Sequence, residues 1–210
     1  MDKMESSELR LYLYKPGNGK DLTLSTVKPA KKQFIEQIVD LADRNTFHND
    51  YYPDPIIKKV IDKSNGLFFV SEPFDKPVSI SGMLQGTLKA IINKRDMDIG
   101  MVLYELTQKG EYFQLSYFLG RASYACDMSR RKLLKPGKLE TIPFQRSRVF
   151  SKQLGKGSRL IMVLDIDKNP FAQINYGTGK DVSFETVKDA GTPLKIKWST
   201  DSFIEIGISR

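Results

Sequence analysis

The stretch IGMVLYEL, from Ile99 to Leu106, is the most informative segment for the fold, because it is almost continuously apolar. A strand with one face on a core and one face in water alternates between apolar and polar residues, whereas a strand covered on both faces reads as an apolar run. The stretch LIMVL, from Leu160 to Leu164, has the same character. Both stretches predict central strands whose outer side is covered as well, either by an N-terminal arm or by another domain.

Further strand-like runs recur between turn signals on both sides of these two stretches. The last run alternates, with Ile204, Ile206 and Ile208 on one face. From Gly66 onward the predicted strands are 67–71, 78–83, 87–93, 98–106, 112–124, 140–144, 159–166, 194–198 and 203–208. About ten short strands without a long helix predict an all-β sandwich. Its core is expected to contain Leu103, Leu115, Leu160, Met162, Leu164, Ile196 and Ile206.

The N-terminal part predicts a hairpin followed by a surface arm. Leucines alternate with polar residues from Glu8 to Tyr14, which is typical of a half-buried strand, and the glycine-containing turn at 16–20 leads to a second strand at 22–27. Residues 29–55 show no clear period and predict a surface crossing, with one or two helical turns at 55–63. We therefore assign 1–62 to a hairpin and arm within the same unit as the sandwich, and 63–210 to the sandwich.

Composition excludes several classes of protein. The 33 basic and 25 acidic residues give a net charge of +8, which allows an acidic partner without requiring one. A single cysteine, Cys126, excludes an internal disulfide, and a single histidine, His48, leaves too few ligands for a zinc site. No run approaches the ~20 apolar residues of a membrane helix, and the charged N-terminus does not resemble a signal peptide. We expect a soluble, cytoplasmic protein.

Motif searches yield no catalytic, cofactor-binding or metal-binding residue. The Gly-x-Ser-x-Gly turn of serine hydrolases is absent, so His48 has no partner nucleophile. The sequences at 177–180 and 17–20 end in Gly-Lys, but they lack the remaining residues of a phosphate-binding loop. Asp165 to Asn169 resembles the start of a calcium loop, although Pro170 and Tyr176 replace the required glycine and glutamate. A calcium site built from dispersed carboxylates remains an alternative.

Basic residues concentrate in one region, at 130–132 and at Lys135, Lys138, Arg146 and Arg148. Such a cluster could contact nucleic-acid phosphates, but the neighbouring aromatic residues form no stacking motif. We interpret the cluster as a solvated or interface surface and expect no nucleic-acid partner. A basic nucleic-acid-binding protein remains an alternative hypothesis.

Six segments in the second part of the chain follow a recognisable order. They are GLFFVSEPF at 66–74, VSISG at 78–82, DMDIGMVLYE at 96–105, LGRASY at 119–124, LKPGK at 134–138, and residues 150–166 with KGSRL at 156–160. In this order they resemble the C-terminal domain of the X-Pro dipeptidyl-peptidase and cocaine-esterase class of α/β-hydrolases. The residues at 156–159 and 169–179 depart from the patterns commonest in that class.

The resemblance implies a jelly-roll β-sandwich of the galactose-binding-like kind. In that class the catalytic serine, aspartate and histidine belong to a preceding α/β domain, so no catalytic residue is carried over. The first hypothesis is therefore a non-catalytic accessory domain that packs beside a catalytic hydrolase domain. The alternative is a free-standing module that binds a carbohydrate or another ligand.

A domain that packs against a partner is expected to expose an apolar patch. The segment from Phe47 to Pro55, with Tyr51 and Tyr52, is the predicted part of that patch. The isolated chain is accordingly expected to self-associate.

Overall fold

The computed structural model describes residues 6–17, 21–46, 51–52, 54–63, 66–169 and 171–209, and strands dominate them. The strands are β1 (Ser6–Tyr14), β2 (Leu22–Ser25), β3 (Phe34–Val39), β4 (Ile57–Lys58), β5 (Leu67–Ser71), β6 (Val78–Ile92), β7 (Asp98–Leu106), β8 (Tyr112–Arg121), β9 (Leu139–Phe144), β10 (Phe150–Leu154), β11 (Arg159–Ile166), β12 (Leu194–Ser199) and β13 (Phe203–Ser209). Three single-turn 3₁₀ helices, η1 (Ala122–Tyr124), η2 (Val182–Phe184) and η3 (Val187–Asp189), are the helical elements of this part of the chain.

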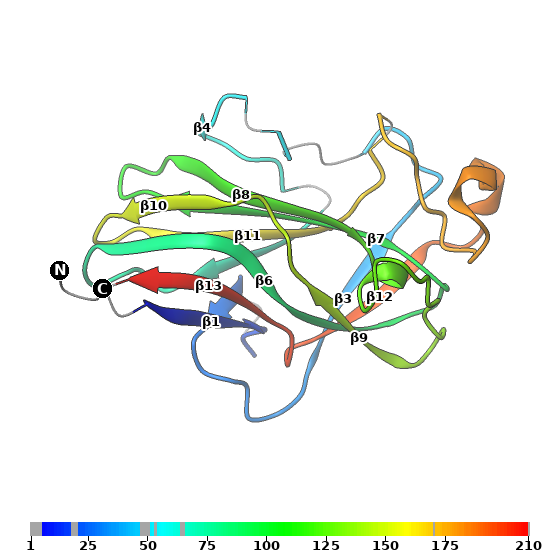
Figure 1. Ribbon diagram of the computed structural model, residues 1–210, viewed down its shortest axis with the longest axis horizontal. Coiled ribbons are helices and arrows are strands. Elements are labelled where there is room, and N and C mark those ends of the chain that lie inside the picture. Colours follow the sequence, from blue (N-terminus) through cyan, green and yellow to red (C-terminus); the bar gives the residue numbers. More distant parts are fainter. Residues whose placement is uncertain are drawn as a thin grey trace.

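The strands form two packed layers, which Figure 1 shows one above the other. In one layer the order is β5-β11-β7-β8-β4, and in the other it is β3-β12-β6-β13-β1. Strand β2 pairs with β1 and, in parallel, with β5, so hydrogen bonds connect the two layers. Strands β9 and β10 both pair with the long strand β6. The predicted all-β sandwich is confirmed.

The main core lies between the layers. All seven residues predicted for it are buried there, namely Leu103, Leu115, Leu160, Met162, Leu164, Ile196 and Ile206. They come from β7, β8, β11, β12 and β13, so both layers contribute to one apolar interior.

A second apolar cluster covers the outer side of β7 and β11. It joins Val102 and Tyr104 of β7, and Ile161 and Val163 of β11, to Tyr51 and Ile61 of the N-terminal arm. Gly100 leaves the space that the Tyr51 ring occupies, since a Cβ atom at this position would collide with the Tyr51 hydroxyl. The prediction that the two apolar strands are covered on both faces is therefore confirmed, and the arm provides the cover.

The predicted surface crossing at 29–55 is wrong in its middle part. Residues 34–39 form β3, which pairs with β12, and alternate residues Ile35, Gln37 and Val39 are buried. The inward-facing position held by Gln37 hid the period-two pattern. Its Oε1 accepts a 2.8 Å hydrogen bond from the buried Trp198 Nε1, which satisfies the indole group.

The helical turns predicted at 55–63 are also wrong, because Ile57 and Lys58 form the short strand β4 against β8. Two separately predicted strands, 78–83 and 87–93, are one long strand, β6, with Gly82 and Gly86 at positive φ. The strand predicted to reach residue 124 ends at Arg121, where η1 begins. The division of the chain at residue 63 stays a prediction.

Candidate functional site

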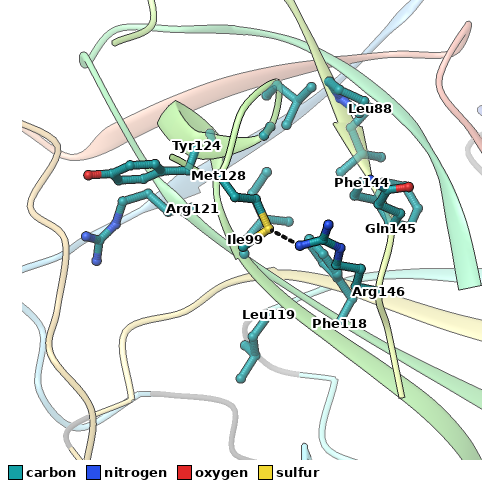
Figure 2. A pocket seen from close by; sticks show the side chains of 15 residues that line it. Leu88, Ile99, Phe118, Leu119, Arg121, Tyr124, Met128, Phe144, Gln145 and Arg146 are labelled. Carbon is teal, nitrogen blue, oxygen red and sulfur yellow. Dashed lines mark hydrogen bonds between the residues drawn. The ribbon is translucent and has the colours of Figure 1, made fainter. Parts of the chain in front are cut away.

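An apolar groove of about 160 Å³ opens between the two layers, where β8 and β9 diverge. Its floor consists of buried core side chains, among them Leu88 of β6, Ile99 of β7 and Ile142 of β9. The Phe118 and Phe144 rings, 5.1 Å apart between centroids, continue the lining toward the surface. Figure 2 shows these side chains around the groove, with Tyr124, Met128 and Arg146 at its rim. The groove is thus an opening into the end of the sandwich core.

A buried carboxylate fixes the wall formed by η1. Asp96 is fully buried and accepts hydrogen bonds from the backbone N–H groups of Met97 and Ser123, both at 3.0 Å. It also accepts from Ser123 Oγ at 2.7 Å and from Arg131 Nη2 at 3.0 Å. Because a buried charge is stable only when it is paired and hydrogen-bonded, this network holds η1 and Arg131 in one arrangement.

A second ion pair fixes the end of β8. Arg121 donates to both carboxylate oxygens of Asp98, at 2.8 and 2.9 Å, and Asn175 Nδ2 donates to Asp98 Oδ1 at 2.8 Å. The hydrogen bonds to Asp98 raise the pKa of the Arg121 guanidinium above its ordinary value. Arg121 lines the groove, yet this bidentate pair already satisfies its charge.

Arg146 at the groove rim has no such partner. Its Nη1 donates at 3.0 Å to the thioether sulfur of Met128, and no carboxylate within the described residues pairs with it. In Figure 2 the Arg146 and Met128 side chains meet across the groove. A thioether is a weak, neutral acceptor, so the guanidinium charge remains available.

The backbone of Arg146 is held in the left-handed region, with φ at 67°. The adjacent Ser147 is buried, and its Oγ accepts a 2.7 Å hydrogen bond from the backbone N–H of Leu84. Ser116 Oγ donates at 2.5 Å to the carbonyl of Arg148. These bonds, at Ser147 and Arg148, anchor the segment that directly follows Arg146. The left-handed conformation of Arg146 costs on the order of 1 kcal/mol for a residue other than glycine.

A second hollow of about 310 Å³ lies beside the groove and shares Leu119 with it. Tyr52, Phe171 and Asn169 are among its lining residues. Three of its lining side chains are apolar and exposed, and we call Tyr52, Leu119 and Phe171 the apolar face. Exposed apolar side chains that gather around one hollow are typical of an interaction surface.

The predicted apolar patch at 47–55 is wrong for Tyr51, which is only 1% exposed and belongs to the cluster on β7 and β11. Tyr52 is exposed as predicted, and its ring lies 5.8 Å from that of Tyr117 on β8. Phe47 to Asp50 and Pro53 lie outside the described residues. His48, the histidine considered for a catalytic role, is among them.

The residues resembling a calcium loop close a turn. Asp167 Oδ1 accepts from the backbone N–H of Asn169 at 3.1 Å, and Asp165 Oδ1 accepts from that of Ile166 at 2.7 Å. Burial raises the pKa of Asp165 to about 7. Lys168 Nζ donates to the carbonyls of Asp40 and Asp43, which ties this turn to the arm.

The other candidates from the sequence, residues 177–179 and Cys126, lie outside the strands. Residues 177–179 lie in a loop where Glu185 accepts from the backbone N–H groups of Tyr176 and Thr178. Cys126 is exposed. Across the described ranges no cluster of three or more histidine, cysteine or acidic residues could hold a metal ion. The same part of the chain contains no helix long and apolar enough to cross a membrane.

Sequence reasoning placed Arg146 only in a general basic cluster and did not single out Leu119, Met128 or Phe171. No local sequence pattern distinguishes Arg146 from Arg121 and Arg131. It differs from them in its acceptor, since Arg121 and Arg131 pair with carboxylates and Arg146 donates to the Met128 sulfur. Leu119 lies within LGRASY, one of the segments that carry the resemblance, and this is the signal that could have directed attention to the end of β8.

A comparison with models of protein families identifies one family. The family model described as "X-Pro dipeptidyl-peptidase C-terminal non-catalytic domain" matches residues 4–195. No significant match is found among curated proteins.

Several solved structures share the fold. An aminopeptidase from a marine sediment Thaumarchaeota archaeon is 19% identical with a TM-score of 0.78, over 98% of this chain and 37% of its own. An α-amino acid ester hydrolase is 19% identical with a TM-score of 0.74, over 97% of this chain and 36% of its own. A CocE/NonD family hydrolase from Staphylococcus aureus is 14% identical with a TM-score of 0.64, over 98% and 37%. The chain therefore spans little more than a third of these proteins.

Proposed function

Since the chain belongs to the family of C-terminal non-catalytic domains of X-Pro dipeptidyl-peptidases, we propose that it docks on a catalytic α/β-hydrolase domain through the apolar face. The observation that carries the proposal is the hollow lined by the exposed apolar side chains of Tyr52, Leu119 and Phe171. Packing against a second domain would remove these side chains from water, which is favourable for apolar surface.

The finer features of the parent protein also belong to this proposal. We infer a serine hydrolase that acts on X-Pro peptides or on esters and amides of similar shape, in the cytoplasm. The family description and the names of the structural neighbours support a hydrolase. The jelly-roll, galactose-binding-like variety of sandwich is inferred from the resemblance of the segments between Gly66 and Arg210.

The isolated chain is expected to show no hydrolase activity. Nucleophilic catalysis needs an activated nucleophile, a positioned base and an oxyanion site, and the sequence contains no serine in a Gly-x-Ser-x-Gly turn. The measurement is turnover of an X-Pro chromogenic amide and of a short-chain ester by the purified chain. Turnover that persists through purification and disappears in a His48→Ala variant would contradict a non-catalytic role.

The docking surface is tested in the protein that carries both parts. Substituting Leu119→Asp together with Phe171→Asp is expected to separate one cooperative thermal transition into two, because two charges would have to be buried in the contact. Cleavage between the parts by trypsin is expected to become about tenfold faster, because proteolysis follows the population of the opened form. Val27→Asp is the control, since Val27 is 72% exposed and lines neither hollow.

Two results would contradict this proposal. If the double variant behaves like the Val27→Asp control, the apolar face is not the contact surface. If neither the coding sequence upstream of Met1 nor a neighbouring gene encodes a domain with Gly-x-Ser-x-Gly, the free-standing binding module becomes the better hypothesis.

A further inference from the structure

We propose that the groove beside Arg146 receives one aromatic side chain of the catalytic domain, followed directly in sequence by a carboxylate that pairs with Arg146. This inference rests on the proposed docking function and names the chemistry of the docked segment. The groove provides an apolar cavity and an available cation side by side, which together define the ligand.

The cavity has the size of a single aromatic ring. A protein cavity of about 150 Å³ lined by apolar side chains holds one benzene molecule, and the groove measures about 160 Å³. Pockets for drug-sized ligands are larger, from about 300 Å³ upward. Phe118 and Phe144 would contact the entering ring, while Leu88, Ile99 and Ile142 form an apolar floor beneath it.

The charge at the rim selects an acidic neighbour for that ring. Arg121 and Arg131 are already paired with Asp98 and Asp96, so Arg146 is the cation that a ligand in the groove can use. A carboxylate would replace the Met128 sulfur as the acceptor for Arg146 Nη1. Charge-assisted hydrogen bonds are about twice as strong as neutral ones, so this exchange favours the bound state.

The backbone at Arg146 keeps the guanidinium at the rim. Its left-handed conformation is one that asparagine or glycine adopts more readily than arginine. The hydrogen bond from the Leu84 amide to Ser147 Oγ anchors the residue that follows it. Backbone strain of this kind concentrates at binding sites, where the surrounding structure holds a side chain in position.

The wider charge distribution agrees with an acidic occupant. The chain carries a net charge of +8, and Arg130 and Lys132 lie in the segment that follows Met128. This potential attracts an acidic segment and repels a basic one.

Peptide binding followed by NMR tests the inference directly. The ¹⁵N-labelled chain is titrated with the blocked peptide acetyl-Gly-Phe-Glu-Gly-amide, and with versions containing Gln for Glu or Ser for Phe. We expect saturable shifts of the amide signals of Gly120, Ala122 and Gln145, which line the groove. Loss of the carboxylate or of the ring is expected to weaken binding about tenfold or more, as for a lost charged hydrogen bond.

A pair of matched variants assigns the carboxylate to its partner. Arg146→Asn removes the charge while keeping a residue that tolerates positive φ, so the fold is expected to be retained. In this variant the Glu and Gln peptides should bind equally weakly. Arg148→Asn removes the same charge from an exposed position outside the groove, and it should leave the tenfold preference for Glu intact.

Equal binding of the Glu and Gln peptides to the unmodified chain, shifts located elsewhere, or no saturable binding would overturn the inference. Such a result leaves the proposed function standing if the Leu119→Asp, Phe171→Asp variant still separates the two parts. If that double variant has no effect while the Glu peptide binds, the docking surface is wrong and the groove is a peptide site with another partner.

Discussion

Replacing Leu164 with alanine is expected to lower the free energy of unfolding by roughly 2–5 kcal/mol, the range found for a fully buried leucine. Leu164 has no exposed surface and lies in β11, between β5 and β7, so its neighbours cannot easily collapse into the space. For a chain of 210 residues this corresponds to a fall in Tm of about 5–20 °C. Thermal denaturation followed by circular dichroism measures it.

Ile38→Ala is the matched control for this experiment. Ile38 is also in a strand, β3, but faces solvent, so its truncation should change Tm by no more than about 2 °C. If the Leu164→Ala chain has the same Tm as the Ile38→Ala control, the inward face of β11 is misassigned.

Replacing Asp96 with alanine is expected to destabilise the chain by about 3–5 kcal/mol, because removing one partner leaves buried charge and hydrogen-bond donors unsatisfied. Arg131 would lose its carboxylate, and the backbone N–H and hydroxyl of Ser123 would lose their acceptor. Urea denaturation measures the loss. The amide signals of η1 should also broaden, since the carboxylate is what holds this wall of the groove.

Asp75→Ala provides the comparison, because Asp75 is an exposed aspartate in a loop and its loss should cost less than about 0.5 kcal/mol. Equal stability of the two variants would mean that the Asp96 network contributes nothing to the fold.

The sequence predicted those parts of the fold whose hydrophobic pattern can be read from consecutive residues. The apolar runs at 99–106 and 160–164 predicted covered central strands, because a strand that is buried on both faces has apolar residues at consecutive positions. Strand β3 was missed because its inward position 37 is polar, and the group that justifies it, the Trp198 indole, is 161 residues away. Period-two patterns fail wherever a buried polar pair replaces an apolar contact.

The candidate site was less predictable than the fold. The availability of Arg146 depends on which other arginines have found carboxylates, and those pairs join residues from different strands and loops. The burial of Tyr51 also depends on a residue that is distant in the sequence. Tyr51 was predicted to belong to an exposed apolar patch, but the missing side chain of Gly100 leaves space for its ring against β7.

The position of β13 has a consequence for biosynthesis. This strand, near the end of the chain, lies between β1 and β6, and Arg10 hydrogen-bonds to Glu205 across 195 residues of sequence. At a translation rate of about 5–20 residues per second, roughly 10–40 s separate the synthesis of these two residues. From the synthesis of β6 until that of β13, both β1 and β6 lack the strand that lies between them, and open strand edges are the surfaces on which unfinished sheets aggregate. The layer containing β1 can therefore close only after β13 has been synthesised.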